Sequence, residues 1–126
     1  MAEPYIKLYR KMLGWEWYDN QNTCRLFIHC LLRANWKPTK WHGKTIEAGQ
    51  FVTSLETLAE ETGLSVSQVR TALNHLIETG ELTSKSQDKS QGRGRIITIQ
   101  NWVEYQGNDK QIDRRIAEES QKNRNR

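Results

Sequence analysis

The stretch that decides the fold is residues 54–80, SLETLAEETGLSVSQVRTALNHLIETG. Ser54 is a favourable N-cap residue, and an apolar stripe at helical spacing follows it. The stripe consists of Leu55, Leu58 and Ala59. Gly63 then stands where many helices end in a left-handed residue. The pattern therefore predicts a short amphipathic helix that ends at Gly63.

A second helix is predicted directly after this glycine. Ser65 and Gln68 have the S-x-x-Q spacing of a capping box, in which each side chain accepts from the other residue's backbone N–H. An apolar stripe follows, and Gly80 ends it. The stripe consists of Val66, Val69, Leu73, Leu76 and Ile77. Two helices joined by a short turn around a glycine are typical of a helix-turn-helix.

The segments that flank these helices predict a small sheet. Residues 81–85 can form a strand, and residues 95–100 (RIITIQ) have the composition of one. A polar, basic loop over 86–94 joins them, and residues 50–53 (QFVT) supply a third strand. A helix-turn-helix followed by a hairpin with a basic tip is a winged helix. We therefore predict an α+β fold, a winged helix-turn-helix with a small antiparallel sheet.

The N-terminal part predicts a helical extension to this fold. Residues 5–9 (YIKLY) are expected to be extended, and a helix is expected over 23–34, with Asn20 among the residues that could cap it. Residues 43–49, bracketed by two glycines, are expected to form a polar, hairpin-like stretch.

Length and composition set the outer limits. With 126 residues, 36% of them apolar, the chain suffices for one small domain. We assign residues 1–105 to the winged-helix domain with its extension, and 106–126 to a polar, partly helical or disordered tail. No apolar run is long enough to span a membrane. Cys24 and Cys30 cannot form a disulfide framework, so we expect small core or boundary residues in a cytoplasmic protein.

The net charge of +4 is unevenly distributed. Residues 1–46 contain eight basic and three acidic residues, whereas residues 47–81 contain one basic and six acidic. Residues 82–101 contain four basic residues and one acidic residue. The basic character therefore belongs to the N-terminal region and the wing, and we expect the helix-turn-helix alone to bind DNA weakly.

Several short motifs resemble those of one protein family. They are Glu47–Ser54 (EAGQFVTS), Leu58-Ala59, Gly63-Leu64-Ser65, Val69–Leu73 (VRTAL), Asn101-Trp102 and Tyr105-Gln106. Together they resemble the N-terminal winged-helix domain of DnaD-like replication proteins, the replisome organisers of phages and low-GC Gram-positive bacteria. The resemblance covers roughly residues 5–106. It implies DNA binding, self-association and a role in loading the helicase at an origin. Such proteins usually continue into a second helical domain, so helicase contacts made by that domain are not assigned here.

The outer face of the second helix is the first candidate for DNA contact, because in a winged helix this face enters the major groove. On a helical wheel it consists of Ser67, Gln68, Thr71, Asn74 and His75. Gln and Asn can pair with adenine, and Ser or Thr can reach bases or phosphates. Arg70, at the edge of the apolar stripe, is assigned to a phosphate contact or a surface ion pair. The alternative is the ordinary polar exterior of a surface helix.

The wing is the second candidate. Four cations surround two glycines, and Asp88 alone opposes them. The cations are Lys85, Lys89, Arg93 and Arg95. Long basic side chains on a hairpin tip suit phosphate or minor-groove contact. The alternative is a loop whose charge only maintains solubility.

Other classes of function find little support. The sequence has no phosphate-binding glycine loop, no H-E-x-x-H and no C-x-x-C, so we expect no enzyme, metal site or cofactor. The tryptophans could stack on single-stranded bases, but are expected to fill the core or an interface between subunits. We expect double-stranded DNA, replisome proteins (helicase or helicase loader) and a second copy of the chain as partners, and no membrane. Two alternatives stay open: a transcriptional regulator, or a protein-interaction and oligomerisation module with little DNA affinity.

Overall fold

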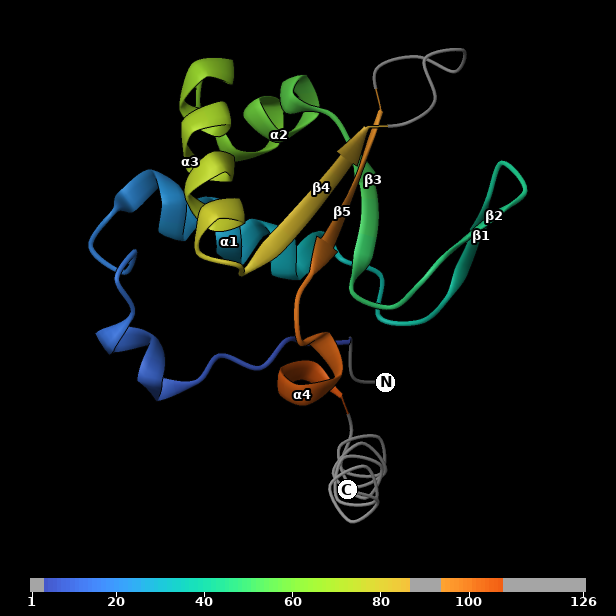
Figure 1. Cartoon of the computed structure of the whole chain (residues 1–126), viewed down its shortest axis with the longest axis horizontal. Coiled ribbons are helices and arrows are strands. Elements are labelled where there is room, and N and C mark those ends of the chain that lie inside the picture. The colour runs from blue at the N-terminus through green and yellow to red at the C-terminus, as the bar shows by residue number, and fades with distance from the viewer. Residues whose placement is uncertain (1–3, 87–93, 108–126) are drawn as a thin grey trace, which may run out of the picture.

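The computed structural model describes residues 4–86 and 94–107, and it confirms the α+β fold (Figure 1). The elements, in chain order, are η1 (Arg10–Gly14), α1 (Gln21–Arg33), β1 (Thr39–Trp41), β2 (Lys44–Ile46), β3 (Gln50–Thr53), α2 (Leu55–Thr62), α3 (Val66–Glu78), β4 (Leu82–Ser86), β5 (Arg95–Ile99) and α4 (Trp102–Gln106).

The three-stranded sheet has the winged-helix arrangement. Its order is β3-β5-β4, and both pairings are antiparallel. Since β3 precedes α2 and β4 follows α3, the two helices form the connection between the outer strands of the sheet. In register, Ile97 lies opposite both Phe51 and Ser84, and the inward side chains Phe51, Leu82, Ile97 and Ile99 join the helices in one core. The predicted small antiparallel sheet is confirmed.

The helix-turn-helix has the predicted caps. The Ser54 hydroxyl accepts from the Thr57 backbone N–H at 3.1 Å, and Gly63 ends α2 with a φ of +80°. At the start of α3, Ser65 Oγ accepts from Gln68 N at 3.0 Å, while Gln68 Oε1 accepts from Ser65 N at 2.9 Å. The capping box is therefore closed in both directions.

The buried stripe of α3 differs from the predicted one. It runs through Val69, Ala72, Leu73 and Leu76, whereas Ile77 is 39% exposed. At 100° per residue, Ala72 lies about 60° from Val69 and Ile77 about 80° away on the other side. The prediction placed Ile77 in the stripe because its side chain is large and apolar, but the core extends instead to Ala72, which is 1% exposed.

A second, two-stranded sheet stands between α1 and β3. Its strands β1 and β2 pair with each other, with Trp41 opposite Lys44. His42 and Gly43 have φ values of 46° and 76°, the positive φ that a two-residue type I′ turn requires. The hairpin prediction was right in kind but wrong in position, because Gly43 forms the tip of a hairpin over 39–46 and does not begin it.

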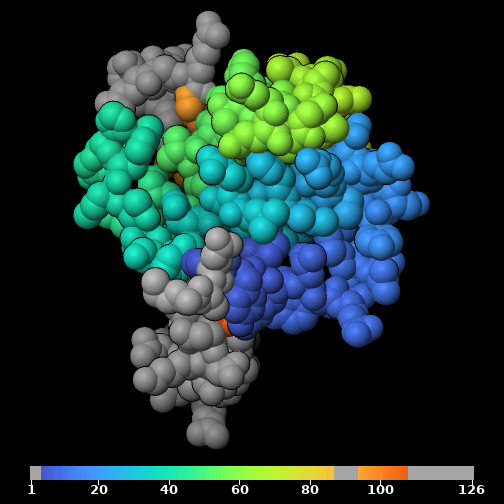
Figure 2. All heavy atoms as spheres, turned by 180° about the vertical axis from the view of Figure 1, so that it is seen from behind, coloured from blue at the N-terminus to red at the C-terminus, as the bar shows by residue number. Residues whose placement is uncertain are grey.

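The N-terminal extension packs along α1, α4 and the C-terminal end of α3. Asn20 caps α1 by accepting from Thr23 N at 3.0 Å, so the helix begins at Gln21, slightly before the expected residue 23. Seen from behind, the N-terminal segment and α1 lie next to each other (Figure 2). α4 packs against the N-terminal segment, where the Gln106 side chain accepts from Lys7 N at 2.7 Å and donates to Lys7 O at 2.8 Å. The residues after the last strand therefore pack back across the domain.

The cysteines, the helix lengths and the tail can each be compared with what the composition predicts. Cys24 and Cys30 are free thiols, one half-buried and one in the core. Burial raises the pKa of Cys30 to about 12 and also raises the pKa of Cys24. None of the helices in the described ranges has the length and apolarity that crossing a membrane needs. Of the expected tail, only Gln106 and Gly107 lie within the described residues.

Candidate nucleic-acid interface

The outer face of α3 presents small polar side chains to solvent. Ser67, Thr71 and Asn74 are all exposed and follow one another at helical spacing. Glu78, also exposed, continues the same line at the C-terminal end. A carboxylate there repels phosphates, so the part of this face from Ser67 to Asn74 is the part suited to approach DNA. Three of the predicted contact residues therefore lie together on one surface.

Gln68 is exposed but committed to the capping box. Its Oε1 accepts the Ser65 backbone N–H, so the side chain lies back along the start of α3. Bidentate pairing with adenine needs both the amide oxygen and the amide nitrogen. The side chain would have to leave the cap to read a base, and its first role is structural.

Arg70 lies on one flank of this face. It is exposed, as is Ile77 about two turns further along the same flank. Within the described residues its guanidinium has no hydrogen bond or ion pair, which leaves it available for a phosphate. The surface ion pair that the sequence left open is not formed with these residues.

The predicted position of His75 on the outer face of α3 was wrong, because its ring faces α1 and the N-terminal extension. Its Nδ1 lies 2.9 Å from Oγ1 of the buried Thr23 on α1, and its ring stacks on Trp17 at 4.2 Å with an interplanar angle of 10°. The wheel places residue 75 at the border of the polar face. The extension folds over that border, and nothing in the local pattern of α3 indicates this long-range contact.

The base of the wing holds two of the four predicted cations. Lys85 is exposed on β4, and Arg95 begins β5 opposite both Ser86 and Thr53. The Arg95 guanidinium reaches Ser84 Oγ at 3.5 Å, a contact at the limit of a hydrogen bond, and among the described residues most of its donors stay unused. Lys89 and Arg93 lie outside the described residues.

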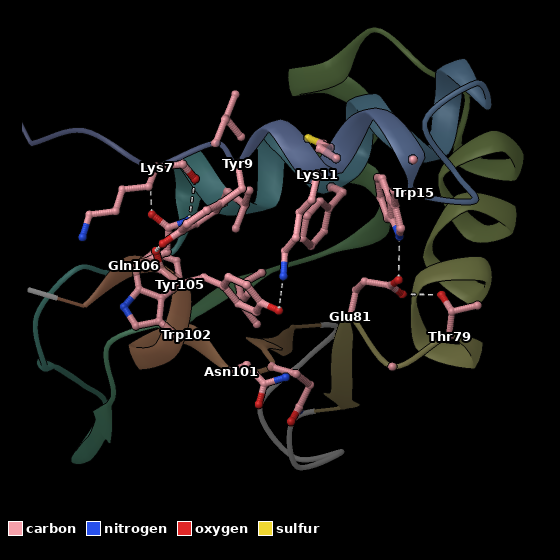
Figure 3. A pocket seen from close by; sticks show the side chains of 18 residues that line it. Lys7, Tyr9, Lys11, Trp15, Thr79, Glu81, Asn101, Trp102, Tyr105 and Gln106 are labelled. Atoms are coloured by element: carbon pink, nitrogen blue, oxygen red, sulfur yellow. Dashed lines mark hydrogen bonds between the residues drawn. The ribbon is translucent and has the colours of Figure 1, made fainter. Parts of the chain in front are cut away.

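The N-terminal extension holds the C-terminal end of α3 in place. Trp15 Nε1 donates to Glu81 Oε1 at 2.8 Å, Trp17 Nε1 donates to Thr79 Oγ1 at 2.9 Å, and the Thr79 hydroxyl also donates to Glu81. Figure 3 shows Trp15 pointing at Glu81 across a cavity of about 420 Å³ between the N-terminal segment, α4 and the end of α3. These two tryptophans therefore support the fold, as expected, and are not free to stack on bases.

The acidic residues of the helix-turn-helix are distributed to two sides. Glu61 faces α1, where its carboxylate lies 3.1 Å from His29 Nε2 and 3.4 Å from Arg33 Nε. Glu56 and Glu60 are exposed on α2. No carboxylate occupies the first two turns of α3, from Val66 to Leu73, so the negative charge of residues 47–81 lies beside the candidate contact face.

The sequence prediction omitted the lysines of the β1–β2 region. Lys37, Lys40 and Lys44 are all exposed. The signal that could have indicated them is the absence of any acidic residue between Asp19 and Glu47.

One comparison with known proteins bears on this surface. Residues 47–80 match a family model described as a helix-turn-helix domain. The match covers β3, α2 and α3, which are the elements that hold the candidate face. Neither the curated proteins nor the solved structures contain a match to this chain.

The match supports a DNA-binding helix-turn-helix. It does not extend to the N-terminal region, the wing or α4, so it leaves the DnaD-like resemblance as a proposal. Among the described residues, no group of three His, Cys, Asp or Glu side chains is placed to hold a metal ion.

Proposed function

We propose that this protein binds double-stranded DNA through the outer face of α3 from Ser67 to Asn74 and the base of the wing. The observation that supports this most strongly is the coincidence of the helix-turn-helix match with a sheet of order β3-β5-β4. Ser67, Thr71 and Asn74 would face the major groove, with Arg70, Lys85 and Arg95 against phosphates.

A salt titration of duplex binding tests this proposal. If lysines and arginines neutralise phosphates, the logarithm of the binding constant falls linearly with the logarithm of salt concentration. Replacing Lys85 and Arg95 by alanine should lower that slope by about one unit for each lost contact. Undetectable binding to any duplex at low salt would contradict the proposal.

We further propose that the protein acts in replication initiation, as a DnaD-like replisome organiser of a phage or prophage. The support is the resemblance of residues 47–54 and 101–106, together with the contact that these two segments make in the fold, where Trp102 packs directly on Gly49. A transcriptional regulator could use the same scaffold. A gene for a helicase loader or a single-strand-binding protein next to this one would favour replication, and a neighbouring operon under its control would favour transcription.

Self-association is the second candidate function. Several large apolar side chains of the N-terminal region and α1 are exposed. They are Tyr5, Leu8, Leu13, Leu32 and Trp36. Contiguous exposed apolar surface is typical of protein interfaces. Sedimentation should detect a dimer or a larger species that dissociates when Leu32 and Trp36 are replaced by serine, and a monomer at high concentration would exclude this role.

A further inference from the structure

The hairpin β1–β2 is an addition to the winged-helix sheet. Its strands pair with each other and not with β3, β4 or β5. Among the side chains of β1, the turn and β2, Ile46 is buried and Trp41 half-buried, and the remainder are exposed. An isolated two-stranded hairpin is at best marginally stable in water. Here the type I′ turn and the anchoring of Ile46 keep the strands paired.

The hairpin region is strongly basic. Three lysines, Lys37, Lys40 and Lys44, occur within eight residues, and no acidic residue occurs from 20 to 46. Contacts hold these lysines in position: for example, Lys40 Nζ donates to Thr45 Oγ1 at 3.0 Å, and Lys37 Nζ lies 4.8 Å from the centre of the Trp36 ring. Holding a cation in place reduces the entropy lost when it meets a phosphate.

The position of the hairpin relates it to the candidate interface. In Figure 1 it rises beside β3, and its tip points toward the end of the molecule at which α3 begins, β4 ends and β5 starts. Figure 2 places the hairpin on the same side of the molecule as the start of β5, seen from behind. The strand β3 itself ends at the base of the wing, because its last residue, Thr53, pairs with Arg95.

We propose that the β1–β2 hairpin is a second basic arm that contacts the phosphate backbone of duplex DNA, beside the segment that faces α3. This inference rests on the proposed DNA binding and extends its contact surface. Lysine binds phosphate as a point charge, and the exposed Thr45, whose hydroxyl oxygen accepts from Lys40, adds a hydroxyl donor. The geometry disfavours stacking on unpaired bases: Trp41 is half-buried and its ring meets His42 edge-on at 4.4 Å.

The test compares the native chain with the triple variant Lys37→Gln/Lys40→Gln/Lys44→Gln in duplex titrations at several salt concentrations. We expect the variant to bind a 30-base-pair duplex at least about tenfold more weakly near 0.1 M salt, with a salt slope lower by about two to three units. Arg10→Gln is the matched control, because Arg10 is an exposed cation on η1, far from the hairpin (Figure 1), and it should leave affinity and slope unchanged.

Each outcome decides a separate point. One outcome would overturn this inference and leave the proposed function intact: the triple variant folds and keeps the affinity and salt slope of the native chain, whereas Lys85→Ala/Arg95→Ala weakens binding. A loss seen only with single-stranded DNA would also overturn it. Absence of duplex binding by the native chain would overturn both. Because the hairpin pairs with itself, the circular dichroism spectrum and melting temperature of the triple variant should match those of the native chain. If they do not, the single variant Lys40→Gln repeats the test, and we expect it to lower the salt slope by about one unit.

Discussion

Gly49 and Trp102 approach so closely that position 49 has no room for a side chain. A Cβ built on Gly49 would lie 2.7 Å from both Cβ and Cγ of Trp102. The glycine also has a φ of +86°, and its carbonyl accepts from Ile99 N at 2.8 Å. The contact joins the residue before β3 to the first residue of α4, and so connects the start of the winged-helix domain to its end.

Replacing Gly49 by alanine should therefore destabilise the protein strongly. The new Cβ must displace the backbone or the Trp102 side chain, and the left-handed backbone adds strain, so we expect a loss of about 2 to 4 kcal/mol in the free energy of unfolding. Urea unfolding followed by circular dichroism measures this. The control is Gly63→Ala, with a similar φ of +80° but nothing within 4 Å of its Cβ, which should cost only about 1 to 2 kcal/mol. Equal losses in the two variants would show that the contact with Trp102 is unimportant.

His75 should contribute to stability and not to the choice of DNA sequence. Replacing it by alanine removes the hydrogen bond to the buried Thr23 and the stacking on Trp17, at a cost of about 1 to 3 kcal/mol. The measurement is thermal unfolding together with binding to a panel of duplexes. A variant of native stability with altered sequence preference would return His75 to the contact face.

Replacing Gln68 should mainly affect stability, whereas replacing Asn74 should mainly affect the preference for DNA sequence. Gln68→Ala opens the capping box, so it should cost about 0.5 to 2 kcal/mol of stability. Asn74 is exposed on α3, so Asn74→Ala should leave stability nearly unchanged and reduce the preference among duplexes by about 1 to 3 kcal/mol. Duplex competition assays check the second effect. Full sequence preference in Asn74→Ala would show that this side chain reads no base.

The two thiols should differ in reactivity. Cys30 lies in the core, and its burial raises its pKa to about 12. The native protein should react with iodoacetamide at Cys24 only, and at Cys30 only after unfolding. The same pKa predicts a stability loss at high pH: the unfolded thiol ionises near pH 9 and the folded one near 12, so stability falls across this interval. Cys30→Ala should show a shallower fall in urea midpoint over that range, and an identical fall would contradict the assignment.

Much of the fold could be predicted from local patterns. The capping box, the glycine at the end of α2 and the composition of residues 95–99 are each readable within a few residues, and each has the predicted structure. The errors have a common cause. Ile77 and His75 were placed from the periodicity of α3 alone, whereas burial along a helix is set by the elements that pack on it.

The candidate site was predicted less completely for the same reason. The positions of Ser67, Thr71 and Asn74 follow from the wheel, but the commitment of Gln68 to the cap requires both of its hydrogen bonds to be seen. The tilt and reach of the β1–β2 hairpin depend on the turn at His42 and Gly43 and on how residues 46–50 join β3, which composition does not encode.

The most direct test of DNA binding by this surface is a titration of the isotopically labelled protein with duplex DNA, followed by the shifts of backbone amide resonances. We predict the largest shifts at Ser67–Asn74, at Lys85 and Arg95, and smaller ones at Lys40 and Lys44. The N-terminal segment from Tyr5 to Lys11, which packs on α4, should stay unchanged. Shifts confined to that segment, or no shifts at low salt, would contradict the account.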